Sequence, residues 1–148
     1  MAAHGLDERR ATLTRLKTIN NGLAWQGSVW DDYELPRSAS GRIAAHAIID
    51  FGAPVKTARD RNLANREKGQ PHILPANVAI VAGTPDDAQA LMAEVFNLLV
   101  DWSPSVTADS WEAKGGYGTR RPGTNATPVR YVEGLFLECV VNQGISQP

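Results

Sequence analysis

The stretch from Thr84 to Trp102 decides the fold, and it reads TPDDAQALMAEVFNLLVDW. Thr84 is a natural N-cap, Pro85 suits the first helical position, and Asp87 stands where a capping box places an acid. Apolar residues then recur at the i, i+3, i+4, i+7 spacing of an amphipathic helix: Ala88, Leu91, Met92, Val95, Leu98, Leu99 and Trp102. The pattern predicts a central helix over residues 84–102, which Pro104 ends.

Segments typical of strands lie on both sides of this helix. Residues 43–51 alternate with period two, which indicates a strand with one fully apolar face. The other expected strands cover residues 73–82, 106–113 and 129–141, and the last of them is apolar on both faces. Pro75 should restrict the start of its strand to an edge or a bulge.

A first helix is predicted over residues 6–19, with leucines near one face, acids in the first turn and bases near the end. Asn20-Asn21-Gly22 is a sequence that commonly ends a helix. The chain is therefore expected to form one α+β domain over residues 1–148. Its core would be a mixed or antiparallel sheet of about four to five strands, with both helices packed on it.

Aromatic and acidic residues are mixed between the first helix and the first strand. Residues 29–33 are a candidate edge strand, and Trp25 and Trp30 are expected to pack the first helix onto the sheet. Asp31, Asp32 and Glu34 could in principle do acid–base work, but a solvated edge explains them better.

Two long polar stretches, residues 52–70 and 114–128, contain almost nothing that could enter a core. Connections in compact domains have a median of about 4–6 residues, and much longer ones usually bind something or are disordered. We therefore expect two flexible, protruding arms. In the first arm, five cations stand against two anions between residues 56 and 70.

Composition excludes several classes of protein. The 148 residues carry a formal net charge of -1, with 43% hydrophobic and 21% charged residues, so no overall field favours nucleic acid or acidic membranes. No apolar run reaches the roughly 20 residues of a membrane helix, and residues 1–5 lack the apolar segment of a signal peptide. We expect a protein kept in a cytoplasm. Cys139, the single cysteine, excludes an internal disulfide.

The residues that could act in catalysis or ligand binding do not combine into a recognisable site. The three histidines, His4, His46 and His72, have no partners at metal-ligand spacing, and Cys139 is expected to be an inert packed thiol. The glycine-rich segment 114–118 lacks the ending and the helix of a phosphate loop. We therefore expect no catalytic residue, no metal and no cofactor. In an enzyme or ligand-binding domain, the pocket would lie near His46, Asp50, Asp31 and Asp32.

Core packing does not explain the basic residues of the two arms. They could be solvated surface, dock onto a neighbouring subunit, or contact phosphates in a nucleic-acid-binding module. The candidate contact residues are Lys56, Arg59, Arg61, Arg66, Lys68, Lys114, Tyr117, Arg120 and Arg121.

The order of segments resembles a known family. The phrases that carry the likeness are Leu35-Pro36, Gly41-Arg42-Ile43, Gly52-Ala53-Pro54, residues 82–88, Val100-Asp101-Trp102-Ser103-Pro104 and residues 127–131. Between residues 5 and 143, the chain resembles the tail terminator proteins of long-tailed bacteriophages, particularly those of actinobacterial hosts.

The resemblance implies a structural virion protein, assembled in the host cytoplasm, that performs no reaction. Such proteins form a six-membered ring that caps the tail tube, stops its polymerisation and joins it to the head and neck. The implied partners are further copies of the chain, the tail tube protein and a head–tail connector or stopper, with DNA passing through the ring without sequence-specific binding. We expect the two arms to dock neighbours or grip the tube. Another neck ring component, such as a stopper, is the nearest alternative.

Overall fold

The computed structural model describes residues 5–56, 71–122 and 128–141. The described chain contains two helices and six strands in the order α1 (Leu6–Leu16), β1 (Ala24–Gln26), β2 (His46–Phe51), β3 (Val55–Lys56), β4 (His72–Ala82), α2 (Pro85–Leu99), β5 (Glu112–Arg120) and β6 (Tyr131–Val141). The predicted α+β class is confirmed, together with the N-terminal helix and the central helix.

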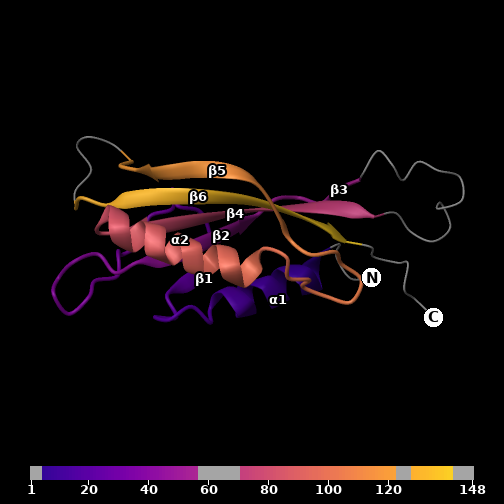
Figure 1. Ribbon diagram of the computed structural model, residues 1–148, viewed down its shortest axis with the longest axis horizontal. Coiled ribbons are helices and arrows are strands. Elements are labelled where there is room, and N and C mark those ends of the chain that lie inside the picture. The colour runs from indigo at the N-terminus through magenta and orange to yellow at the C-terminus, as the bar shows by residue number, and fades with distance from the viewer. Residues whose placement is uncertain (1–4, 57–70, 123–127, 142–148) are drawn as a thin grey trace, which may run out of the picture.

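The described strands form one mixed sheet. Five of them lie in the order β1-β2-β4-β6-β5, and the short β3 pairs with the start of β4. β1 and β2 run parallel, whereas the other pairs are antiparallel. Both helices lie on the same side of the sheet (Figure 1), so one sheet face is covered by helices and the other is not.

The helix-covered face holds the main core. Alternate residues of three neighbouring strands point into it and meet the apolar side of α2. The strand residues are Ala47, Ile49, Ala76, Val78, Ile80, Leu135 and Leu137, and the helix residues are Leu91, Val95 and Leu99. Trp111 is the largest fully buried side chain, and its indole Nε1 donates to Thr12 Oγ1 of α1 at 3.1 Å. This bond ties α1 to the segment that leads into β5.

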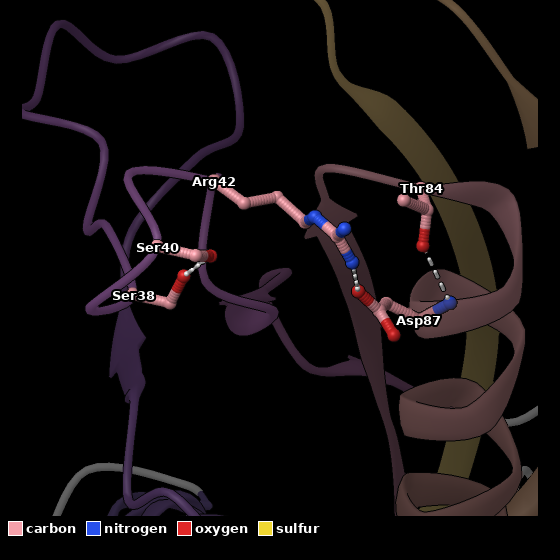
Figure 2. Close-up of polar contacts among 5 residues, drawn as sticks. All are labelled: Ser38, Ser40, Arg42, Thr84 and Asp87. Atoms are coloured by element: carbon pink, nitrogen blue, oxygen red, sulfur yellow. Dashed lines mark hydrogen bonds and ion pairs between the residues drawn. The ribbon is translucent and has the colours of Figure 1, made fainter.

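The predicted N-cap of α2, Thr84, is confirmed. The Asp87 backbone N–H donates to Thr84 Oγ1 at 3.1 Å (Figure 2). Pro85 occupies the first turn. The helix ends at Leu99, three residues before the expected end, because Val100 adopts an extended conformation and pairs with Trp111. The next residue, Asp101, has a φ of 66°, which is incompatible with a continued helix.

A small hairpin over residues 36–44 packs against the start of α2. Arg42 forms an ion pair with Asp87 at 3.8 Å (Figure 2), and both side chains are about half exposed. An exposed pair of this kind contributes about 0–1 kcal/mol. Gly83 lets the hairpin approach closely, because a Cβ there would lie 2.6 Å from Arg42 Cγ. Residues 41–43 and 82–88, two of the segments that carry the family resemblance, therefore contact each other.

Pro75 does not lie on an edge strand, because β4 is the central strand of the sheet. Pro75 lies opposite Gly52, where β2 has just ended and β3 has not begun. Its carbonyl accepts the Gly52 N–H at 2.9 Å, but Pro75 has no N–H to return the bond. The proline thus interrupts pairing on one flank only, and on the other flank it stays in register with Glu138 of β6.

The second expected arm is wrong for residues 114–120, which belong to β5 and pair with β6 along the sheet edge. This strand was missed because it has almost no apolar residues and includes Gly115, Gly116 and Gly118. Two register shifts accompany these glycines, and Lys114 pairs with Glu112 at 3.0 Å. This segment is therefore a strand because it pairs with β6, and not because its own residues alternate.

Other boundaries also differ from the sequence-based expectations. Residues 29–33 are not a strand, since the edge beside β2 is β1, and Trp30 is 81% exposed instead of packing α1 onto the sheet. The strand expected over 106–113 begins only at Glu112, and the one expected from residue 43 begins at His46. The first helix ends at Leu16 instead of residue 19.

The first expected arm, 52–70, lies partly outside the described residues. Val55 and Lys56 pair with β4 as β3, whereas residues 57–70 are not described, and neither are residues 123–127 of the second arm.

Candidate functional site

The uncovered face of the sheet, which we call the open face, carries a trough of about 510 Å³. Residues 27–33 cross over one side of this face, and β5 borders the other side. The trough is lined by Gly27, Ser28, Val29, Trp30, Ile48, Asp50, Asn77, Val78, Ala79, Tyr117, Arg120, Arg121, Pro122, Val132, Gly134 and Phe136. Its volume is in the range of about 300–1,000 Å³ that is common for binding sites.

The floor of the trough is apolar. Ile48, Ala79 and Val132 come from three adjacent strands and are buried. They point away from the helices, because side chains alternate along each strand. Two aromatic side chains are left in contact with solvent at this surface: Phe136 is 39% exposed and Trp30 is 81% exposed. The trough thus combines a dry floor with exposed aromatic groups.

β5 supplies an aromatic and cationic wall. Tyr117 lies over Gly134, where a Cβ would collide with its ring, and its ring centroid is 6.3 Å from that of Phe136 in an edge-on arrangement. The Arg120 guanidinium lies 4.5 Å from the Tyr117 ring centroid, and its Nε donates to Gly118 O at 3.4 Å. Burial raises the pKa of Tyr117, and the nearby Arg120 opposes this shift. The phenol is therefore neutral at ordinary pH.

Charged groups stand at opposite sides of the floor. Asp50 and Asn77 are paired in register on β2 and β4, and both are exposed. Arg120 and Arg121 lie at the β5 side. Such a surface can bind an apolar group and, at its arginine side, a carboxylate.

A second aromatic group lies beside the trough, where residues 27–33 cover the open face. Trp25 stacks on His46 with ring centroids 5.2 Å apart, and Tyr33 meets both rings edge-on. His46 Nδ1 lies 2.8 Å from Ala44 O, so this nitrogen carries the proton and donates. The Tyr33 hydroxyl then donates to Nε2, also at 2.8 Å. Both bonds fit a neutral imidazole.

Burial lowers the pKa of His46 from its ordinary value of 6.5, and the bond to Ala44 only partly opposes this effect. In the unfolded chain, His46 takes up a proton at about pH 6.5, whereas the folded chain resists it. This contribution to stability is complete above that pH and is lost as the pH falls towards the folded-state pKa. We expect the free energy of unfolding to decrease from about pH 7.5 to about pH 5, and to decrease less in His46→Gln. Urea unfolding at each pH measures this free energy for both proteins. If it fell equally with pH in the wild type and in His46→Gln, the lowered pKa of His46 would be contradicted.

The sequence placed a hypothetical enzyme pocket near His46, Asp50, Asp31 and Asp32, and the structure separates these residues. Asp50 lines the trough, whereas His46 is buried under Tyr33. Asp31 accepts the Ser28 N–H at 2.9 Å in an exposed turn, and Asp32 is exposed. Neither residue lines the trough.

Cys139 is buried on the helix-covered face, as expected for a packed thiol. Its Sγ donates to Asp109 O at 3.1 Å. Burial, reinforced by the carboxylates of Glu8 and Asp109, raises its pKa to about 12. A thiol with so little thiolate is a poor nucleophile.

The candidate contact residues lie in different parts of the chain. Tyr117, Arg120 and Arg121 line the trough, and Lys114 is exposed on the same strand. Lys56 is in β3, and Arg59, Arg61, Arg66 and Lys68 are outside the described residues.

Sequence reasoning missed Trp30, Asn77, Gly134 and Phe136 as residues of the trough. The alternation within residues 129–141 does place Phe136 on the face opposite Leu135 and Leu137. It does not reveal that helices cover only one of the two faces.

Comparison with protein-family models gives no match, and comparison with curated proteins gives no relative. Among the described residues, no group of three or more His, Cys, Asp or Glu side chains could hold a metal ion. In the same part of the chain, neither helix has the length and apolar character needed to cross a membrane.

Proposed function

We propose that this chain is a structural subunit of the tail-terminator type, which assembles as a ring on the end of a phage tail tube. One observation carries the proposal: the domain has two unlike apolar surfaces on opposite sides of its sheet. The open face has the trough with Trp30 and Phe136, and the helix layer exposes Phe96. Rings close through contacts between two different patches of each subunit.

The resemblance in segment order supports the same proposal. Residues 82–88 form the junction of β4 and α2, and residues 100–104 follow the end of α2. Residues 41–43 belong to the hairpin that packs on the start of α2. These three phrases thus occupy turns at the two ends of α2, where the helix meets the sheet.

In the proposed ring of six, the chain stops addition of tube protein and offers a joining surface to head–tail proteins, while DNA passes through the central hole. Its partners are further copies of itself, the tail tube protein and a connector or stopper protein. The chain then works in the virion without a reaction of its own. Arg120 and Arg121 are positioned to contact a neighbouring polypeptide, because they border the trough.

Reconstitution with purified tail tube protein tests this function. The full chain should bind to tube ends and limit tube length in proportion to the amount added. Electron microscopy of negatively stained samples would show capped, shortened tubes and annular particles. If the chain does not bind tube ends but binds the portal-side complex, it is a stopper instead. A chain that does neither would contradict the proposal.

A further inference from the structure

We propose that the trough of one subunit receives an exposed stripe of helix α2 from a second copy of the chain, with Phe96 as the apolar anchor. The stripe consists of Asp86, Gln89, Ala93 and Phe96, which are all exposed. The inference rests on the proposed ring function and specifies which two surfaces of neighbouring subunits meet.

The stripe has the geometry of a single helix face. Its members are spaced i, i+3, i+7, i+10, so they lie along one side of α2. The buried residues Ala88, Leu91, Val95 and Leu99 occupy a different side and pack on the sheet. Phe96 is the only aromatic residue in the two helices, and 43% of its surface is exposed. Aromatic side chains of this kind are enriched among residues that dominate interfaces.

The trough and the stripe face opposite sides of one chain, and the stripe reaches β5 only where Gln89 Nε2 donates to Thr119 Oγ1 at 3.2 Å. The trough is on the open face of the sheet, whereas α2 lies on the helix-covered face. Contact between them therefore joins two copies front to back. After the first contact, one copy still has a free stripe and the other a free trough, so the arrangement continues until a ring closes.

Charge is complementary between the two surfaces. α2 contains three acidic residues and no lysine or arginine. Asp87 is paired with Arg42, and Glu94 accepts the Asn20 N–H, so within α2 Asp86 is the acid that belongs to the exposed stripe. Arg120 and Arg121 border the trough. An acid facing these guanidiniums favours one orientation of the incoming helix.

The spacings of the two surfaces agree. From Asp86 to Phe96, ten residues of helix advance about 15 Å. In the trough, Arg120 is in register with Val132, four residues along β6 from Phe136. Four residues of strand advance about 13 Å. A helix that places Phe96 against Phe136 therefore brings Asp86 close to Arg120 and Arg121.

Disulfide trapping tests the contact directly. In the full chain, Phe96→Cys and Phe136→Cys are introduced together, and the protein is oxidised both alone at rising concentration and on tube ends. Cys139 gives little background because it is buried and its pKa is raised to about 12. We expect a ladder of covalent oligomers on denaturing gels, and the largest of them should be the closed ring.

Single-cysteine variants are the controls. A stripe-to-trough contact gives no ladder with Phe96→Cys alone or Phe136→Cys alone. Efficient dimers from Phe96→Cys alone would indicate a symmetric contact between helices and would overturn the inference. Absence of a ladder from the double variant under both conditions would also overturn it.

Charge reversal provides a second measurement. Asp86→Lys and Arg120→Glu should each weaken the association between copies of the chain roughly tenfold. The two changes together in one chain should restore most of this association. Arg10→Glu on the exposed surface of α1 is the matched control and should leave association unchanged. Equal effects of Arg10→Glu and Arg120→Glu would indicate only general charge effects and would count against the contact.

The outcomes separate this inference from the proposed function. If the wild-type chain caps tubes but the cysteine pair gives no ladder on them, the contact is wrong and the function stands. If the ladder forms but tubes are not capped, the contact is right and the function is wrong.

Discussion

Gly116→Ala should detach β5 from β6 and lower the free energy of unfolding by about 1–3 kcal/mol, the usual cost of forcing extra atoms into a packed site. A Cβ on Gly116 would collide with the backbone carbonyl oxygen of Gly134. Because the obstacle is backbone in the middle of β6, it cannot rotate away as a side chain could. The trough would lose its β5 wall, including Tyr117 and Arg120.

Gly118→Ala is the matched control for this change. It is on the same strand, but a Cβ there meets nothing within 4 Å. We expect its stability to stay within about 0.5 kcal/mol of the wild type. Urea unfolding compares the two variants, and amide hydrogen exchange shows whether protection is lost in β5 and β6. Equal stabilities for the two variants would show that the strands do not approach as described.

Trp111→Ala should be the most damaging single change, with a loss of about 3–5 kcal/mol. The side chain is fully buried, and its ring centroid lies 6.4 Å from that of Phe51. Its Nε1 donates to Thr12 Oγ1, and that hydroxyl in turn donates to Glu8 O at 2.6 Å. Truncation therefore leaves a cavity and removes a hydrogen bond that links α1 to the segment leading into β5.

Trp111→Phe divides this loss into its parts. Phenylalanine keeps an aromatic ring at the site but has no N–H for Thr12. The lost hydrogen bond should cost about 1–2 kcal/mol, so this variant should lie between wild type and Trp111→Ala. Thermal and urea unfolding of all three proteins measure the order. A Trp111→Ala protein as stable as the wild type would contradict the described burial.

The parts of the fold that were predictable are those with strong local signals. The Thr84 cap, Pro85 and the apolar spacing of α2 act within a few residues of each other, so the sequence predicts the helix closely. β4 and β6 are long and apolar, and both were expected. β5 was missed because its residues are held by pairing with β6, a tertiary effect that no pattern within 114–120 reveals.

The candidate site was only partly predictable, for a related reason. Arg120 and Arg121 were candidates because core packing did not account for them, and they line the trough together with Tyr117, another candidate contact residue. Trp30 was expected in the core, since indole rings usually bury large areas, but it lies at the edge of the trough. Whether an apolar side chain faces helices or solvent depends on where the helices pack.

The burial of Cys139 gives the chain a reporter of its own motions. The thiol lies near the end of β6, where Cys139 pairs with Leu74 of β4, so reagents reach it only when that part of the sheet opens. The rate of its alkylation under native conditions therefore measures the frequency of opening, without any introduced label. A subunit held between neighbours should be alkylated more slowly than a free one, which makes the same sulfur atom a kinetic indicator of assembly.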